Sequence, residues 1–188
     1  MLVDFIIPTY HRPAPLKCML ASLVAQTNNN WKASVIIDNP DDVEITNLVK
    51  SFNDPRIKFT KLENRYNDWG HTPREIGKQA SDAEYIIMSG DDNYYVPTFV
   101  DELQKASSTR PIVIYWDMVH SHYDYSYFKC APGFNQIDMG AFAIRKDVAH
   151  SIKLNTSYAA DGEYIESIKK KYPSEKMIGI GKVLFVHN

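Results

Sequence analysis

Two hydrophobic patterns alternate along this chain, and together they predict a layered fold of strands and helices. Short apolar runs at residues 2–7, 34–37, 57–62, 85–88 and 112–116 have the length of buried strands. Between the first runs, apolar residues recur every three or four positions, as on one face of a helix: Leu16, Met19, Leu20, Leu23 and Val24, then Ile45, Leu48, Val49 and Phe52. This order of strand and helix predicts a parallel sheet with right-handed crossovers.

The later part of the chain repeats these patterns less regularly. We expect strands at residues 138–145 and 177–186, and helices at residues 75–80, 98–107, 146–152 and 159–171, with Thr98 as the N-cap of its helix. Residues 117–134 have neither helical nor strand periodicity, and His, Tyr and Phe crowd positions 120–128. Long irregular stretches of this kind are usually functional, so we expect a loop that covers or serves a site.

Size and composition narrow the class of protein. With 188 residues, 44% of them hydrophobic, the chain can form one domain spanning 1–188. A net charge of −2 argues against a nucleic-acid partner. Cys18 and Cys130 are isolated, which favours a reducing compartment over a disulfide framework. No run is long and apolar enough for a membrane span, so we expect a soluble, cytoplasmic domain without membrane insertion, possibly within a longer multidomain chain.

Two adjacent carboxylates follow the strand predicted at residues 85–88. Ser89 and Gly90 end that strand, so Asp91 and Asp92 are expected at its carboxyl edge, where open α/β sheets bind ligands. Neighbouring carboxylates repel each other unless a cation lies beside them, and oxygen ligands favour Mg²⁺ or Mn²⁺. The alternative is that Asp92 or Asn93 only turns the chain before the next helix.

Common nucleotide-binding signatures are missing. Pro8, Thr9 and Tyr10 follow the first strand where a dehydrogenase would have a glycine-rich turn, and Gly181-Lys182 is followed by Val183 rather than by Ser or Thr. A dehydrogenase and a P-loop enzyme are therefore not expected. Without a glycine cradle, the charge of a bound diphosphate has to be met by a metal ion and a few side chains.

Several short motifs, taken in order, resemble the inverting GT-A glycosyltransferases of family 2. They are Ile6-Ile-Pro-Thr-Tyr10, Gln26-Thr27, Asp38, Gly70-x-x-x-Arg74, Glu84-Tyr-Ile and Asp91-Asp92. The resemblance implies a GT-A, Rossmann-like, mixed and mainly parallel sheet flanked by helices. It also implies that residues 1–93 bind a UDP-sugar and that residues 94–188 bind a carbohydrate or another hydroxyl acceptor. Because the agreement comes from separate strand ends that share one edge, it is more specific than any single motif. The sugar would be a hexose, with glucose as the default.

The resemblance assigns roles to the residues that match the family. Pro8, Thr9 and Tyr10 would lie against the uracil, with Tyr10 stacking on it, and Arg12 would stand near the mouth of the loop. Asp38 would accept hydrogen bonds from the base or ribose. The remaining residues would bind the diphosphate and a Mn²⁺ or Mg²⁺ ion. Arg74 would approach the phosphates, and Asp91 would bind the ribose or the metal. Asp92 would ligate the metal directly, and His187 would lie near it. The Asn that usually follows the family's Arg is Glu75 here.

An inverting transfer also needs a base for the acceptor hydroxyl. Ala160-Asp161-Gly-Glu163 resembles the family's Glu-Asp-x-Glu segment, so Asp161 is the predicted base, with Glu163 and Asp138 in reserve. Trp69 would either wall the sugar pocket or belong to the core. The aromatic residues at 120–128 would suit a carbohydrate acceptor or simply cover the sheet.

Simpler and competing interpretations exist for the same residues. Asp38 could close an Asx turn, Arg74 could pair at the surface with Glu75 or Asp68, and Asp161 could cap a helix. Two other functions are compatible with these residues. A metal-dependent nucleotidyltransferase shares the sheet and the acidic pair and releases pyrophosphate. A non-catalytic nucleotide-sugar or glycan-binding module would keep Tyr10 and Asp38 but tolerate loss of Asp161. Release of free UDP would separate the glycosyltransferase from the nucleotidyltransferase. Loss of turnover with intact binding in Asp161→Asn would separate it from the binding module.

Overall fold

The predicted strands and helices of the first half all form. In the computed structural model, which describes residues 1–188, β1 spans Val3–Thr9, β2 Trp31–Ile37, β3 Ile57–Lys61 and β4 Tyr85–Met88. The helices between them are α1 (Pro13–Val24), α2 (Val43–Ser51) and α3 (His71–Ala80). Pro13 and Pro15 lie in the first turn of α1, where a missing N–H costs nothing, and Asp42 caps α2 by accepting from Ile45 N.

These strands set up the binding edge of the sheet. β1 pairs in parallel with β2 on one side and β4 on the other, and β2 pairs with β3, so the order is β3-β2-β1-β4. The chain therefore leaves β1 toward β3 and later returns to the opposite side of β1. Such a reversal opens a crevice at the carboxyl ends of the strands, which here carry the loops after Thr9, Ile37 and Met88.

The second half completes the sheet with strands of both directions. Its elements are β5 (Tyr94–Tyr95), α4 (Phe99–Ala106), β6 (Val113–His120), β7 (Ser126–Phe128), β8 (Phe142–Arg145), α5 (Lys146–Ser151), α6 (Ala160–Lys171) and β9 (Met177–His187). β8 is antiparallel to both β4 and β6, while β9 is parallel to β6 and antiparallel to β5. Counting directions through these pairings, β5, β7 and β8 oppose the other six of the nine strands. The predicted mixed, mainly parallel sheet is confirmed.

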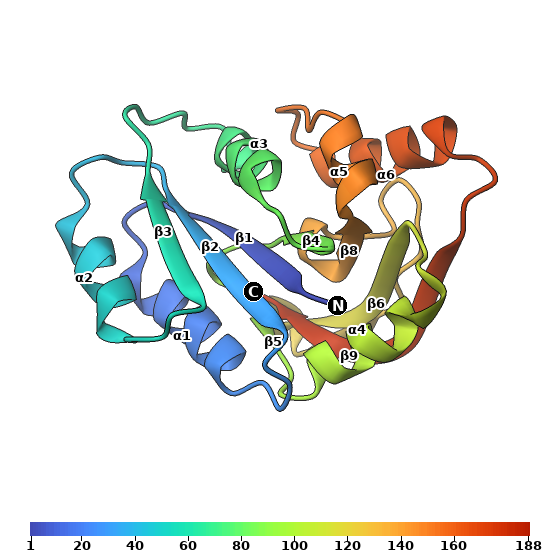
Figure 1. Cartoon of the computed structure of the whole chain (residues 1–188), viewed down its shortest axis with the longest axis horizontal. Helices are drawn as coiled ribbons and strands as arrows, with labels where there is room; N and C mark the ends of the chain where they lie inside the picture. The colour runs from blue at the N-terminus through green and yellow to red at the C-terminus, as the bar shows by residue number, and fades with distance from the viewer.

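Helices cover both faces of this sheet (Figure 1). α3, α5 and α6 lie on one side and α1 and α4 on the other. Every residue of β1 and β4 is buried, as expected for strands whose two faces are both covered by helices. Gly77 lets α3 approach β1 closely, because a Cβ at this position would lie 2.5 Å from Ile6 Cγ2.

Three details of the sequence prediction are wrong, and a fourth, the N-cap of α4, is confirmed in position only. The stretch 117–134 is not an irregular loop throughout, since β6 continues to His120 and turns back as β7. Asp138 is not in a strand: it accepts from Gly140 N at 2.7 Å and caps a single 3₁₀ turn, Met139–Ala141. Helix α3 begins at His71 rather than Glu75. Thr98 occupies the N-cap position of α4, but its side chain makes no capping hydrogen bond.

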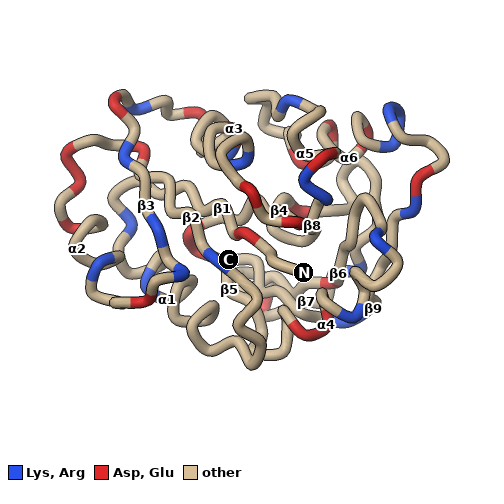
Figure 2. The backbone as a smooth tube through the Cα atoms, viewed as in Figure 1, with Lys and Arg blue, Asp and Glu red and all other residues tan.

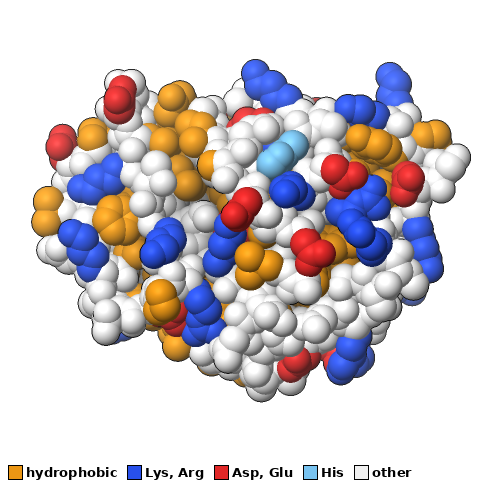
Figure 3. All heavy atoms as spheres, in the orientation of Figure 1, with side chains coloured by type: hydrophobic (Ala, Val, Ile, Leu, Met, Phe, Trp, Pro, Cys, Tyr) orange, Lys and Arg blue, Asp and Glu red, His pale blue; other side chains and the backbone are white.

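Charged residues are spread over the chain rather than gathered. Basic and acidic positions are interspersed along the backbone in Figure 2, and both kinds stand among apolar and neutral side chains on the face seen in Figure 3. None of the helices is long and apolar enough to cross a membrane.

Candidate active site

A cleft of about 860 Å³ opens at the carboxyl edge of β1, β2 and β4. It is lined by loops after these strands, by the start of α3, and by residues from the segments that precede β8 and α6. All ten predicted site residues line this one cleft: Pro8, Thr9, Tyr10, Arg12, Asp38, Arg74, Asp91, Asp92, Asp161 and His187. The sequence placed them on six separate segments, and the tertiary fold brings those segments to a common space.

The acidic pair after β4 is already paired with a cation from the protein. Arg12 donates from Nη2 to Asp92 Oδ2 at 2.8 Å, and its Nη1 lies 3.0 Å from Asp91 Oδ1. Asp91 is buried, and burial raises the pKa of its carboxyl, whereas Asp92 is more open to the cleft. The two carboxylates thus share one guanidinium, which reduces the repulsion between them.

The donor set at this edge suits a hard divalent ion. Asp91 and Asp92 offer only oxygen atoms, and Thr9 Oγ1, which is buried in the lining of the same cleft, has no hydrogen-bond partner. Oxygen donors with room for further ligands are what Mg²⁺ and Mn²⁺ require. The residues therefore fit the predicted metal, provided that Arg12 moves off the carboxylates it now contacts.

Tyr10 and Asp38 stand where the nucleoside is expected. The Arg65 guanidinium lies 3.6 Å from the centre of the Tyr10 ring and donates to Tyr10 Oη at 3.1 Å. Asp38 is buried and accepts from Tyr66 N at 3.0 Å and Asn67 N at 3.4 Å. Its carboxylate therefore shapes the loop after β3, and each oxygen keeps a lone pair that a ligand could use.

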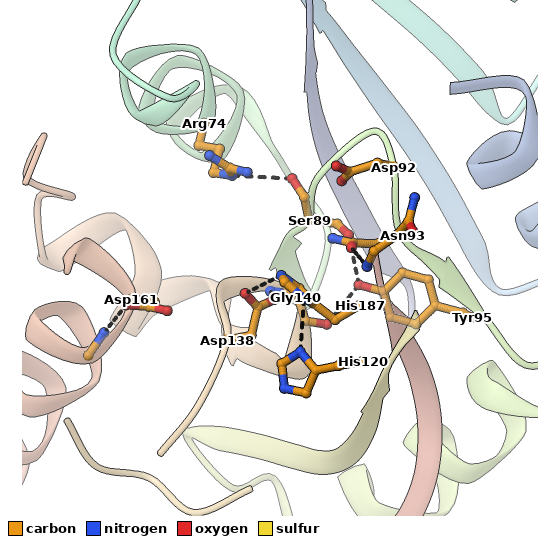
Figure 4. A network of polar contacts seen from close by, with 12 residues as sticks. Arg74, Ser89, Asp92, Asn93, Tyr95, His120, Asp138, Gly140, Asp161 and His187 are labelled. Carbon is orange, nitrogen blue, oxygen red and sulfur yellow. Dashed lines mark hydrogen bonds and ion pairs between the residues drawn. The ribbon is translucent and has the colours of Figure 1, made fainter. Parts of the chain in front are cut away.

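Arg74 projects from the first turn of α3 into the cleft rather than pairing at the surface. It donates from Nε to the carbonyl of Ser89 at 3.2 Å and from Nη1 to the carbonyl of Trp69 at 2.8 Å (Figure 4). The backbone of Gly70 passes so close to β1 that a Cβ would lie 2.9 Å from Pro8. Only glycine tolerates this approach at φ 80°, and the approach brings Arg74 to the end of β1.

Asp161 lies in the first turn of α6 and also faces the cleft. It accepts from the backbone N–H of Gly162 at 2.7 Å, and burial together with the nearby Asp138 raises the pKa of its carboxyl. Glu163 does not line the cleft, because its carboxylate accepts from Ser157 Oγ at 2.8 Å and from Asn155. Of the three candidate bases, Asp161 and Asp138 thus reach the cleft.

Two exposed aromatic side chains stand together at this cleft. Trp69 is 69% exposed and has φ 57°, and Tyr158 is 88% exposed, with its ring edge toward Trp69 at 6.2 Å. Trp69 is therefore not a core residue. Exposed rings with a non-glycine residue in the left-handed region are features of binding sites. By contrast, Tyr123, Tyr125 and Tyr127 lie on the β6–β7 hairpin and do not line the cleft.

His187 is the last residue of β9 and lines the cleft without contacting the acidic pair. Its Nε2 lies 3.4 Å from Asp138 Oδ2 and its Nδ1 lies 3.2 Å from His120 Nδ1. The prediction that His187 ligates a metal together with Asp91 and Asp92 has no support from these contacts and stays a prediction.

Sequence reasoning missed six polar or aromatic residues of the cleft: Arg65, Asn67, Asp68, His71, Asn135 and Tyr158. Asp68 accepts from Thr72 N at 2.9 Å and so caps the start of α3. Burial lowers the pKa of His71, whose Nδ1 is buried without a partner. An earlier predicted start of α3 would have brought Asp68 and His71 to the end of the helix that faces the cleft, whereas no local signal points to Arg65 or Tyr158.

Comparison with known proteins identifies the family. The family described as "Glycosyl transferase family 2" matches residues 4–150. This chain belongs to glycosyl transferase family 2. A glycosyltransferase of Haemophilus influenzae, itself described as uncharacterized, is 22% identical to this family 2 domain over 110 residues, which are 58% of this chain and 36% of that protein.

Solved structures agree on the fold. S. aureus TarS 1-349 superposes with a TM-score of 0.80 at 14% identity, over 100% of this chain and 60% of that one. The same TarS fragment in complex with UDP-GlcNAc superposes with a TM-score of 0.78 at 15% identity, over 58% of its length. The mannosyltransferase PcManGT of Pyrobaculum calidifontis, in complex with GDP-Man and Mn²⁺, gives 0.76 at 12% identity, over 98% of this chain and 56% of that one. The fold is that of GT-A glycosyltransferases, and this family 2 domain spans little more than half of these neighbours.

Proposed function

We propose that this domain transfers a hexose from a UDP-sugar to a hydroxyl of a glycan or another acceptor, with inversion and with Mn²⁺ or Mg²⁺. One observation carries the proposal. The acidic pair, the Arg12 and Arg74 side chains, and a carboxylate free to accept a proton line a single cleft at the switch point of the sheet. Membership of family 2 supports the reaction class.

The donor half of the proposal rests on the loops after β1 and β2. Tyr10 offers an aromatic ring and Asp38 a buried carboxylate at the same end of the cleft, which suits a base and its ribose. TarS is described in complexes with UDP and UDP-GlcNAc, which supports a uridine donor, whereas PcManGT is described with GDP-Man. We keep UDP as the proposed nucleotide and treat glucose and N-acetylglucosamine as alternatives for the sugar.

The protein side chains divide the work between binding and proton transfer. Arg74 would meet the diphosphate charge, since its guanidinium already stands at the ends of β1 and β4. Arg12 would exchange its carboxylate partners for a phosphate when donor binds. Asp161 would accept the proton of the acceptor hydroxyl during attack at the anomeric carbon, on the side of the cleft built by α6. Trp69 and Tyr158 would pack against sugar C–H surfaces.

Asp91 and Asp92 would hold the metal ion. When bound, a divalent ion would neutralise the charge that builds on the departing diphosphate. The Arg12 guanidinium, which lies 3.0 Å from Asp91 Oδ1 and 2.8 Å from Asp92 Oδ2, would have to give up these contacts to the ion.

A donor panel tests the proposal. The protein would be incubated with UDP-glucose, UDP-GlcNAc, UDP-galactose and GDP-mannose, with Mn²⁺ or with a chelator, and free nucleoside diphosphate would be measured. We expect release of UDP from a UDP-sugar, dependent on metal and increased by an oligosaccharide acceptor. Release of pyrophosphate from nucleotide substrates would favour a nucleotidyltransferase instead. Tight donor binding without release of UDP, by calorimetry on the same samples, would favour a binding module.

A further inference from the structure

Three histidines form a compact cluster outside the acidic pair. His120 ends β6, His187 ends β9, and the two face each other in the parallel register of these strands. His122 joins them from the turn that follows β6. One ring nitrogen of each residue lies within 4.8 Å of those of the other two. The histidines are at residues 120, 122 and 187, so only the pairing of β6 with β9 brings them together.

The spacing of the rings is close to that of three imidazoles on one tetrahedral ion. With Zn–N bonds of about 2.0–2.1 Å, tetrahedral geometry puts ligand nitrogens roughly 3.4 Å apart and ring centres roughly 5 Å apart. The Nδ1 atoms of His120 and His187 are 3.2 Å apart. The ring centres are 5.0 Å apart for His120 and His187, 5.5 Å for His120 and His122, and 5.7 Å for His122 and His187.

Asp138 provides an independent indication. Its Oδ2 lies 3.4 Å from His187 Nε2, on the opposite side of the ring from His120 (Figure 4). A carboxylate at Nε2 favours the proton on that nitrogen, which leaves the Nδ1 lone pair aimed into the cluster. Metal-binding histidines typically have such a carboxylate behind them. Asp138 is itself held by the hydrogen bond from Gly140 N at 2.7 Å.

The surroundings keep the three rings in place. Phe128 of β7 packs edge-on against His120 at 5.6 Å, and Tyr123 lies 4.4 Å from His122 between ring centres. Ser121, which separates His120 from His122, is hydrogen-bonded to the side chain of Asn188. The turn is therefore fastened to the residue that follows His187.

We propose that His120, His122 and His187 bind one divalent transition ion of the zinc class, with Asp138 positioning His187. Neutral imidazoles suit Zn²⁺, Co²⁺, Ni²⁺ and Cu²⁺ better than Mg²⁺ or Mn²⁺, which separates this site from the oxygen ligands of Asp91 and Asp92. Three protein ligands leave a fourth position for water, and the exposure of His122 gives solvent access to it. The bound ion would tie the β6–β7 hairpin to β9 beside the cleft. This site does not depend on the proposed transferase function.

Cobalt and zinc titrations of metal-free protein test the site. We expect one Co²⁺ per chain with the visible d–d bands of a tetrahedral site, displaced by Zn²⁺ but not by excess Mg²⁺. His122→Ala should abolish the bands, and because His122 is exposed this variant should fold normally. Asp138→Asn should weaken Zn²⁺ binding by about 10- to 100-fold.

Two control variants separate this cluster from other ligands. His11→Ala removes an exposed histidine that lies 3.0 Å from Asp42 and is not a member of the cluster, and should leave cobalt binding unchanged. Asp92→Asn alters the acidic pair and should also leave it unchanged. Thermal unfolding gives a second readout, since Zn²⁺ should raise the Tm of the wild type and not that of His122→Ala. Bands that survive in His122→Ala, or an absence of Co²⁺ uptake by the wild type, would overturn the proposal.

Discussion

Arg12 and Asp92 are 80 residues apart in the chain, and their side chains are joined by a 2.8 Å hydrogen bond in the cleft. Because the same guanidinium lies 3.0 Å from Asp91, it occupies the position from which a metal ion would neutralise both carboxylates. A metal ion bound by the acidic pair, as proposed, would therefore compete with Arg12 for it. Arg12 is about half exposed, so the competition is modest in energy.

The first prediction follows from this competition. Arg12→Gln should tighten Mn²⁺ binding in the absence of nucleotide by roughly 2- to 30-fold, since Arg12 is half exposed and each of its two ion pairs contributes about 0.2–1 kcal/mol. Calorimetric titration with Mn²⁺ measures the effect. Arg65→Gln is the matched control, because Arg65 lies in the same cleft and contacts Tyr10 instead of the acidic pair. Weaker Mn²⁺ binding in Arg12→Gln would mean that the acidic pair is not the metal site.

The second prediction concerns the base. Asp161→Asn should lower kcat by about 10²- to 10⁴-fold, the usual contribution of general base catalysis, and should leave the Kd for UDP nearly unchanged. Single-turnover kinetics and UDP titration measure the two quantities. Glu163→Gln is the control, since Glu163 is engaged by Ser157 and Asn155 outside the cleft lining. If Glu163→Gln lowers kcat to this extent and Asp161→Asn does not, Glu163 is the base.

The third prediction is a pH dependence. The pKa of Asp161 is raised above 3.8 by burial and by the charge of Asp138, against the opposing effects of the Gly162 N–H and Arg74. A base acts when ionised, so kcat/KM should fall as pH decreases through this raised pKa, and the acid limb should lie above pH 3.8. Asp138→Asn removes the neighbouring negative charge and should move the limb to lower pH. If kcat/KM falls at the same pH in the wild type and in Asp138→Asn, the ionisation of Asp161 does not cause the fall.

The fourth prediction separates binding from stability at Trp69. Trp69→Ala should change the free energy of unfolding by less than about 0.5 kcal/mol, because the side chain is 69% exposed. It should lower kcat/KM by about tenfold, the equivalent of losing one aromatic packing contact of about 1.4 kcal/mol. Tyr123→Ala is the matched control, since Tyr123 is 66% exposed and lies outside the cleft. Equal losses of kcat/KM in Trp69→Ala and Tyr123→Ala would show that Trp69 does not bind the substrate.

The fifth prediction explains Glu75, which stands where family members usually have Asn. Its Oε2 lies 2.7 Å from Nζ of the fully buried Lys78, and it accepts from Leu154 N at 2.8 Å. Glu75→Ala leaves the ammonium with Ile152 O as its remaining hydrogen-bond acceptor, at 2.6 Å, and should cost about 3 kcal/mol. Urea unfolding measures this cost.

The double variant Glu75→Leu with Lys78→Met is the decisive comparison. Replacing both members of a buried ion pair by apolar side chains is often neutral, so the double variant should be more stable than Glu75→Ala alone. If the double variant loses the full cost of both single changes, the two residues act independently.

The sequence was sufficient for the parts of this protein that are set by local periodicity. Apolar runs and helical spacing predicted β1 to β4 and the helices α1 and α2, because strands and helices bury faces that repeat every two or about 3.6 residues. Once a parallel sheet was expected, the strand ends carrying Tyr10, Asp38 and Asp91 had to meet at one edge. The family motifs lie mostly on those ends, which is why they could be recognised.

The tertiary structure decided what depends on pairing between distant segments. The contact of Arg12 with the acidic pair, the meeting of Trp69 with Tyr158, and the histidine cluster each join segments whose distance no local pattern fixes. The cluster depends on the pairing of β6 with β9, whose register shifts twice between Tyr115 and Met118. A shift of one residue turns a side chain to the opposite face of a sheet, so His120 and His187 meet only because of how that register ends.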